Sequence, residues 1–263
     1  MLIDTHVHFR ESMTPDDVAG IMERARAAGV EQLVAVGCDL DTNAAALRVT
    51  AAYPHRVKAA VAYDRSLAGS DARVEDIRAL IHAAPAGHVA AIGEIGLDFY
   101  YSPETADPQQ DLMDSQLALA RDLRLPVIVH SRQADAETLA LLAAHAKAWS
   151  GAPDRIGVLH CFTGEEPFAR NLIALGFMIS FSGIVTFRNA DSLRAVAKAI
   201  PKDRLLIETD APYLTPVPHR GKPNEPCYLP AVAALMARIH GFTVEDVAKI
   251  TCANARRLFQ LAL

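Results

Sequence analysis

Residues 1–8 read MLIDTHVH, a short apolar run that ends in two histidines one residue apart. The run predicts a buried β-strand. Side chains two positions apart on a strand share a face, so the imidazoles of His6 and His8 should converge at its end. Neutral imidazole is the commonest protein ligand of divalent transition metals. The stretch therefore predicts part of a metal site, provided that other strands end in similar residues; two histidines satisfied within the core are the alternative.

Apolar runs and helical patterns alternate along the rest of the chain. Thr14, Pro15 and two following aspartates predict the start of a first helix, because these residues suit an N-cap and a first helical turn. Seven further strands are predicted at 32–37, 57–62, 89–94, 126–130, 156–160, 176–181 and 205–210. Later helices are predicted at about 41–52, 71–82, 112–120, 135–146, 192–200, 230–240 and 243–261. This alternation indicates a parallel sheet that is covered on both faces.

Eight such units close a (β/α)8 TIM barrel, which we expect to form a single domain over residues 1–263. A chain of 263 residues with 51% hydrophobic content can bury a core of the necessary size. The irregular, proline-rich stretch 212–230 favours neither helix nor strand, and we expect it to form a loop over the barrel mouth.

Charge and cysteine usage limit the protein's partners and compartment. The net charge of −5 and the pI near 6.0 provide no overall attraction for long nucleic acids, so an anionic substrate needs a local site. Four widely spaced cysteines without a C-x-x-C pair indicate free thiols in a reducing compartment. With no signal-peptide pattern and no long apolar stretch, we expect a cytoplasmic protein with no membrane association. A monomer is favoured over an oligomer.

Potential metal ligands recur where the predicted strands end. Active sites of such barrels lie at the carboxyl ends of the strands. Six residues fall there, namely His6, His8, Glu94, His130, His160 and Asp210. Any one of them could end a strand by chance, but six at one rim indicate a shared site. Four imidazoles and two carboxylates exceed the needs of one tetrahedral ion and suit two divalent metals with open positions.

One division of these ligands suits hydrolysis. His6, His8 and Asp210 would hold one ion, His130 and His160 the other, and Glu94 would bridge them. Two such cations lower the pKa of a shared water toward ~7 and polarise the scissile group. Asp210 would accept a proton from the water and deliver it to the leaving group; a purely passive ligand role for Asp210 is the alternative.

Several motifs resemble one family nearly end to end. They are IDTHVHF (3–9), GEIGLDFYY (93–101), VIVHSR (127–132), LHCFTG (159–164), IETDAPYL (207–214), RGKPNEPCYL (220–229) and TCANARRLF (251–259). Through them the chain resembles the TatD-type metal-dependent hydrolases of the amidohydrolase superfamily. The resemblance implies a TIM barrel, one or two divalent metal ions (Zn, Mn, Mg, Ni or Co), and a deoxyribonuclease that acts as an exonuclease. It also implies ligand roles for the six residues above. Asp210 and Glu94 are the predicted catalytic residues.

The chain departs from the family pattern after its third strand. The usual Gly-x-His-Pro segment is replaced by Val61-Ala62-Tyr63-Asp64. The family's histidine there lies by the substrate, so the departure leaves hydrolysis intact but makes the substrate less certain. We expect Tyr63 to take its place as a substrate contact, with Asp64 turned to solvent.

Other residues are predicted to contact the substrate or to orient the ligands. Arg132 lies two residues after His130 on the same strand face, where it would clamp a phosphate or a ligand carboxylate. Arg220, Lys222 and Asn224 on the proline-rich loop would hold a phosphate backbone, with an ordinary solvated loop as the alternative. Glu208 is placed to orient a ligand imidazole or to serve as a structural hydrogen-bond acceptor.

Three functions follow, in order of preference. The first is a metal-dependent phosphodiesterase that acts on DNA ends or a small phosphodiester. The second is a hydrolase of a small ester, amide or lactone that uses the same metal site, favoured by the negative net charge and the missing His-Pro. The third is a noncatalytic barrel that binds metal or a partner, which predicts an incomplete ligand set.

Overall fold

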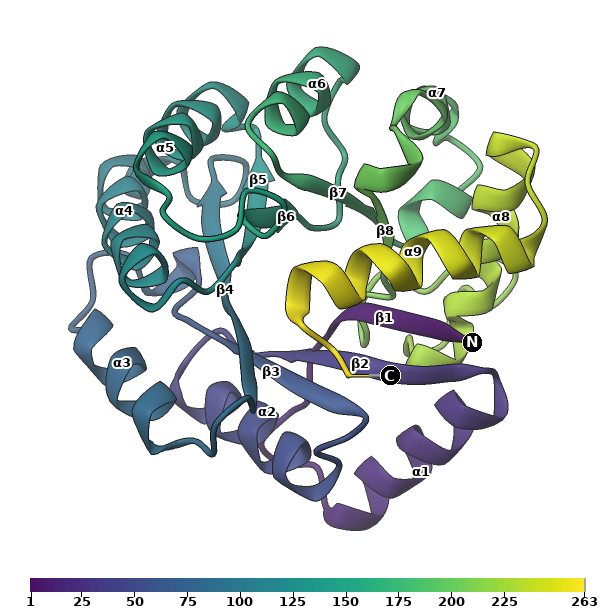
Figure 1. Cartoon of the computed structure of the whole chain (residues 1–263), viewed down its shortest axis with the longest axis horizontal. Helices are drawn as coiled ribbons and strands as arrows, with labels where there is room; N and C mark the ends of the chain where they lie inside the picture. Colours follow the sequence, from purple (N-terminus) through teal and green to yellow (C-terminus); the bar gives the residue numbers. More distant parts are fainter. Residues whose placement is uncertain (263) are drawn as a thin grey trace.

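Eight parallel strands form one sheet that curves into a barrel (Figure 1). The computed structural model describes residues 1–262. Each strand pairs with the next in chain order, from β1 to β8. The strands are β1 Leu2–Val7, β2 Val30–Val36, β3 Val57–Val61, β4 Val89–Asp98, β5 Val127–Arg132, β6 Gly157–Leu159, β7 Met178–Phe181 and β8 Leu205–Ile207. The predicted (β/α)8 TIM barrel is confirmed.

Helices surround the sheet and also cover one end of it. The α-helices are α1 Pro15–Ala27, α2 Leu40–Ala52, α3 Val74–Ala83, α4 Ala106–Leu123, α5 Asp135–Ala148, α6 Glu166–Ala174, α7 Asp191–Ala199, α8 Leu229–His240 and α9 Val244–Phe259. Short 3-10 helices are η1 Arg65–Leu67, η2 Pro103–Thr105, η3 Gly183–Thr186, η4 Lys202–Arg204 and η5 Pro226–Tyr228. Figure 1 shows α9 lying across the barrel end. The ligands must therefore be reached from the opposite end.

The start of α1 confirms the capping expected from the sequence. The Thr14 hydroxyl accepts a hydrogen bond from the Asp17 backbone N–H at 3.2 Å, and the Asp17 carboxylate accepts one from the Thr14 N–H at 2.9 Å. This reciprocal pair satisfies two backbone groups that a helix start leaves without partners.

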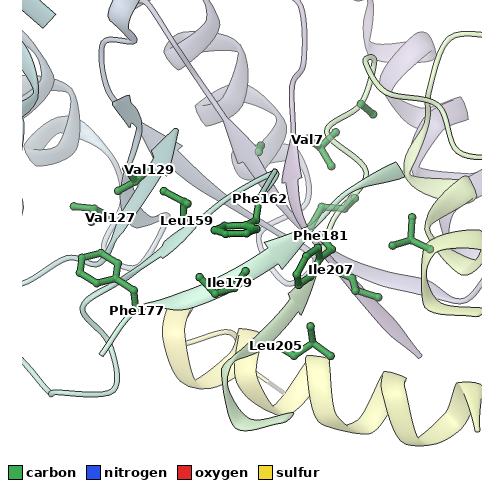
Figure 2. Close-up of a cluster of buried hydrophobic side chains, with 14 of the residues drawn as sticks. Val7, Val127, Val129, Leu159, Phe162, Phe177, Ile179, Phe181, Leu205 and Ile207 are labelled. Carbon is green, nitrogen blue, oxygen red and sulfur yellow. The ribbon is translucent and has the colours of Figure 1, made fainter. Parts of the chain in front are cut away.

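The two-residue period of the strands divides the core into two parts. Val127 and Val129 belong to the layer between strands and helices, which Figure 2 shows with neighbouring residues of β6, β7 and β8. Ile128, between them, packs in the barrel interior with Leu258 and other residues of α9. His130 shares the parity of Ile128, so the same alternation that fills the barrel carries its side chain inward at the mouth.

The last strand meets the first at the mouth, and this closes the ring. Val7 forms an isolated parallel bridge with Ala211. The Asp210 N–H donates to the His6 carbonyl at 3.0 Å, and the His8 N–H donates to the Ala211 carbonyl at 2.8 Å. Residues 200 positions apart in the sequence are thus held together by backbone hydrogen bonds.

Two predicted strand ends are wrong by three residues or more. β4 continues past Glu94 to Asp98 and pairs with β5 through Gly96 and His130. Gly96 has φ +146°, and a Cβ there would lie 2.0 Å from the His130 carbonyl oxygen, so only glycine allows this pairing. β8 ends at Ile207 rather than Asp210, because its pairing with β7 stops at Phe181, and Asp210 itself adopts the left-handed region with φ +59°. α3 and α4 also begin at Val74 and Ala106, away from the predicted starts at 71 and 112.

No single helix in residues 1–262 has the length and apolar character to cross a membrane. One bent pair of helical segments reaches that length and composition when the two are taken together. The segments are Pro226–His240 and Val244–Phe259, and they meet at 106°.

Candidate metal centre

The six predicted ligands come together at the carboxyl ends of the strands. Their backbones lie on β1, β4 and β5, directly after β1 and β6, and three residues past the end of β8. Four of the side chains are buried, and those of His8 and His130 are half-buried. The residues form two groups, and within each group the ligand atoms lie within 4.8 Å of one another. The groups are His6, His8 and Asp210, and Glu94, His130 and His160. Glu94 belongs to the second group and also contacts the first.

The first group surrounds one oxygen of Glu94, and we call it the Oε2 side. Glu94 Oε2 lies 3.4 Å from His6 Nε2 and 3.7 Å from His8 Nε2. Asp210 Oδ1 lies 3.9 and 3.4 Å from the same two nitrogens. The two Nε2 atoms are 3.1 Å apart. Tetrahedral metal–nitrogen bonds of about 2.0–2.1 Å separate neighbouring ligand atoms by roughly 3.3 Å, so these spacings fit one divalent cation.

The second group surrounds the other oxygen of Glu94, and we call it the Oε1 side. Glu94 Oε1 lies 3.5 Å from His130 Nδ1 and 3.4 Å from His160 Nε2. His160 Nε2 is buried and has no hydrogen-bond partner. A buried polar atom without a partner is costly in a folded protein, and a bound cation would satisfy it. The donor set therefore fits a second divalent ion.

Neighbouring acceptors fix which nitrogen of three imidazoles faces the centre. His8 Nδ1 donates to the Val36 carbonyl at 3.0 Å. His130 Nε2 donates to Asp98 Oδ2 at 3.3 Å, and His160 Nδ1 donates to Glu208 Oε1 at 3.3 Å. Each bond places the ring proton on the far nitrogen and leaves the inward nitrogen with a free lone pair, as a metal ligand requires.

Charge in the centre is concentrated on carboxylates. Burial disfavours a charged His160, but Glu94 and Glu208 outweigh burial and raise the pKa of His160 to about 10. Burial also opposes ionisation of Glu94, yet His160, His6 and Arg65 hold the pKa of this carboxyl well below its ordinary value. Glu94 is thus negative at neutral pH. A divalent cation would supply positive charge in place of the proton on His160.

Two backbone conformations near the ligands are uncommon. Asp210 has φ +59°, and Cys161, directly after His160, has φ +46°. Non-glycine residues rarely occupy this left-handed region, and each costs of order 1–2 kcal/mol. The Cys161 N–H donates to Glu208 Oε1 at 2.6 Å, which ties the strained turn to the carboxylate that orients His160.

Arg65 is a site residue that the sequence analysis missed. It lies in η1, after β3, and its Nη1 donates to Glu94 Oε1 at 2.5 Å. Its Nε is 3.8 Å from Asp98 Oδ2, and its side chain is 25% exposed. The signal was present in the sequence, because Arg65 follows the segment 61–64 that departs from the family pattern. The Asp64 carboxylate caps η1 and lies 3.5 Å from the Arg65 guanidinium.

The prediction for Tyr63 is wrong. Its side chain is only 3% exposed and packs in the layer between strands and helices. Burial and the nearby carboxylate of Asp76, on α3, raise the pKa of its phenol. Its backbone N–H and carbonyl are both hydrogen-bonded by Gln116, at 2.7 and 2.8 Å. Tyr63 shares the outward parity of Val61, so strand alternation turns it away from the mouth.

One of the three loop residues differs from expectation. Asn224 is buried, and its amide donates to the carbonyls of Thr209 at 2.8 Å and Tyr213 at 2.6 Å. This contradicts its predicted phosphate contact, since the side chain instead holds the turn around Asp210. The Arg220 guanidinium lies 4.1 Å above the Phe187 ring and donates to the Thr215 carbonyl. Lys222 is exposed and forms no salt bridge within residues 1–262.

Arg132 stays at the mouth, as predicted, but with unexpected neighbours. Its guanidinium carbon lies 4.1 Å from the centre of the Tyr100 ring and 4.6 Å from that of Tyr101. No carboxylate in residues 1–262 lies within salt-bridge distance of it, so it does not clamp a ligand carboxylate.

Known proteins match the chain over nearly its whole length. A family model described as TatD related DNase matches residues 3–260. The chain is 39% identical over 261 residues to YabD of Bacillus subtilis, named a metal-dependent hydrolase, which covers 99% of this chain and 100% of that protein. It is 36% identical over 268 residues to the protein of Edwardsiella piscicida named 3'-5' ssDNA/RNA exonuclease TatD, with 99% and 100% covered. The crystal structure of the TatD homolog YjjV from Escherichia coli K12 matches with a TM-score of 0.89 and 30% identity, covering 99% and 98% of the two chains.

Proposed function

Because the chain belongs to the TatD related DNase family of metal-dependent hydrolases, we propose that it is a phosphodiesterase that removes nucleotides from the ends of single-stranded DNA. The relative from Edwardsiella piscicida, whose name states a 3'-5' exonuclease of single-stranded DNA and RNA, supports this substrate class. The proposal includes the ligand roles of the six residues at the mouth, with Asp210 and Glu94 as catalytic residues.

One observation carries the proposal, namely that the two oxygens of Glu94 face two separate ligand groups. Oε2 faces His6 and His8, whereas Oε1 faces His130 and His160. A carboxylate placed in this way can be shared by two cations. Bound there, divalent cations supply Lewis acidity that lowers the pKa of water toward ~7 and polarises a phosphoryl oxygen.

Asp210 is the group placed to move the proton. Burial raises the pKa of its carboxyl, but the neighbouring imidazoles of His8 and His6 outweigh burial and lower it, so Asp210 is ionised at neutral pH. It accepts one proton from the attacking water as the new P–O bond forms. It then returns that proton to the oxygen of the leaving nucleotide as the old P–O bond breaks.

Arg65 supplies the fixed positive charge that a phosphodiester needs. Its guanidinium bonds Glu94 Oε1 and remains partly open to the mouth. A guanidinium in this position stabilises the additional negative charge of a pentacoordinate phosphoryl group. We therefore assign to Arg65 the substrate contact that the sequence suggested for Tyr63.

The test is release of nucleotides from a labelled single-stranded oligonucleotide by protein that has been stripped with a chelator and reloaded. Mg²⁺, Mn²⁺ and Zn²⁺ are supplied separately, and the Asp210→Asn variant serves as the inactive control. We expect metal-dependent release that Asp210→Asn abolishes. Absence of release with every metal, or unchanged release by Asp210→Asn, would overturn the proposal.

Hydrolysis of a small ester, amide or lactone is the second candidate. It is favoured by the net charge of −5 and by the Asp64 carboxylate, which lies 3.5 Å from Arg65 and offsets part of its positive charge. A panel of uncharged esters and lactones separates the two candidates. Turnover of these substrates by protein that leaves oligonucleotides intact would reverse the order.

A further inference from the structure

Two exposed tyrosines and one arginine form a cluster beside the metal centre. Tyr100 is 52% exposed and Tyr101 is 68% exposed, and both follow β4. Their ring centres are 4.9 Å apart with the planes at 83°. The guanidinium of Arg132, at the end of β5, lies over both rings. We call these three residues the tyrosine cluster.

The tyrosine cluster is tied to the proposed ligands through one carboxylate. Asp98 Oδ1 accepts hydrogen bonds from the backbone N–H groups of Tyr100 and Tyr101, both at 3.0 Å. The other oxygen of Asp98 accepts from His130 Nε2 at 3.3 Å. One buried side chain therefore sets both the orientation of His130 and the position of the two rings.

A second anchor holds the loop that carries the rings. The buried side chain of Gln109, on α4, accepts from the Asp98 N–H at 2.7 Å and donates to the Ser102 carbonyl at 2.9 Å. The Phe99 N–H also donates to the Arg132 carbonyl at 3.0 Å. The rings are thus exposed although their backbone is fixed on both sides, so they present aromatic surface to solvent at a fixed position.

The chemistry of the cluster points to a nucleobase. Exposed aromatic rings stack on bases of any sequence, and an arginine beside them adds cation–π attraction and a contact for phosphate. Arg132 has no carboxylate partner within residues 1–262, so its N–H groups are not neutralised by the protein. Aromatic faces together with a basic group are typical of sites for single-stranded nucleic acid.

We propose that Tyr100, Tyr101 and Arg132 form a subsite that stacks an unpaired nucleobase of the strand whose phosphodiester lies at the metal centre. This inference rests on the proposed phosphodiesterase function and names the part of the substrate that the cluster recognises. It predicts selection of single strands, because a base inside a duplex is already stacked and paired.

The test compares two oligonucleotides of equal length and charge. One is a labelled single-stranded octathymidylate, and the other carries abasic residues in place of its three 3'-terminal nucleosides. Fluorescence anisotropy measures binding in the metal-loaded Asp210→Asn background, where turnover is prevented, and nucleotide release is measured in the otherwise unaltered enzyme. The variants are Y100A/Y101A and, as matched control, Y100F/Y101F, which keeps both rings.

We expect the octathymidylate to bind roughly tenfold tighter than the abasic strand, a preference that Y100A/Y101A loses and Y100F/Y101F keeps. If Y100A/Y101A prefers the octathymidylate over the abasic strand as strongly as Y100F/Y101F does, the proposed subsite is wrong. The proposed phosphodiesterase activity is not affected by that result. A folding defect is recognised by a lowered melting temperature in the alanine variant. In that case Arg132→Gln, which keeps both rings, must reduce affinity for both strands by about threefold or more, and no change would overturn the role of Arg132.

Nucleotide release tests the proposed function separately from the subsite. If the enzyme releases nucleotides from neither strand, the phosphodiesterase proposal fails. The binding preference still decides the subsite under that condition, because anisotropy does not require turnover.

Discussion

The two sides of Glu94 differ in how their charge is balanced. The Oε2 side contains two imidazoles and the carboxylate of Asp210. The Oε1 side contains two imidazoles and no second carboxylate ligand, and the Arg65 guanidinium already bonds its Glu94 oxygen. A cation on the Oε2 side would lie near two carboxylates, those of Glu94 and Asp210. A cation on the Oε1 side would lie near the carboxylate of Glu94 alone, which already bonds the Arg65 guanidinium.

The imidazoles of the two sides are also held differently. His8, on the Oε2 side, is oriented by a backbone carbonyl, which keeps the same charge at every pH. His130 and His160, on the Oε1 side, are oriented by the ionisable carboxylates of Asp98 and Glu208. The comparison teaches that similar ligand sets can bind cations with unequal strength, since neighbouring charges decide the affinity. We expect the Oε2 side to bind its metal more tightly.

Loss of the shared carboxylate should have the largest effect. Glu94→Gln removes a ligand from both sides at once, so we expect nucleotide release to fall by more than about 10³-fold and metal to be lost from both sides. Metal analysis after gel filtration gives the content, and an oligonucleotide assay gives the rate. Retention of the wild-type metal content would show that Glu94 is not a shared ligand.

Removing one ligand from each side tests the inequality directly. Titration of chelator-stripped protein with Mn²⁺ or Zn²⁺, followed by calorimetry, should show a tight and a weak step. His8→Gln should weaken the tight step and His130→Gln the weak step, each by about 10²-fold or more. If both variants weaken the same step, the division into two sides is wrong.

Asp98→Asn should affect the Oε1 side alone. Replacing an orienting carboxylate lowers metal affinity by about 10–100-fold, so we expect a weaker second step and an unchanged first step. Asp122→Asn, at an exposed ion pair with Arg78 in the last turn of α4, is a matched loss of charge that should change neither step.

Asp98→Asn should also change how the stability of the fold depends on pH. Burial raises the pKa of the Asp98 carboxyl, but the His130 hydrogen bond and the Tyr101 N–H outweigh burial and lower it to about 2. A lowered pKa stabilises the fold above the unfolded-state pKa of about 4, and that stabilisation is lost as pH falls toward about 2. Thermal unfolding of metal-free protein should therefore separate wild type from Asp98→Asn at pH 6 and bring them together near pH 2. A constant difference would contradict the assignment.

Arg65 should produce the smallest change. Its guanidinium repels a cation on the Oε1 side, so Arg65→Gln should tighten the second metal step by about tenfold. The same variant should bind inorganic phosphate more weakly, because the fixed positive charge is gone. Arg65→Lys keeps the charge and serves as the control. A weaker second step in Arg65→Gln would mean that Arg65 supports the metal rather than competing with it.

Periodicity in the sequence was enough to predict the barrel and the meeting of six side chains at its mouth. His6, His130 and His160 each follow an apolar strand, and strand alternation with a parallel sheet forces such ends to one rim. The same reasoning failed for Tyr63 and Asn224. Tyr63 lies two residues past the end of β3, and the sequence did not show that the alternation of the strand continues to it. Asn224 lies in an irregular loop, which a two-residue period does not describe.

The sequence by itself determined the fold, through a strand and helix pattern repeated eight times, and it identified the proposed ligands as polar residues at the ends of apolar runs. The tertiary structure alone decided how those groups are charged and oriented. Arg65 beside Glu94, Asp98 behind His130 and the rings under Arg132 are contacts between segments far apart in the chain. Such contacts depend on distances of a few ångströms across the mouth, and electrostatic interactions change steeply over that range.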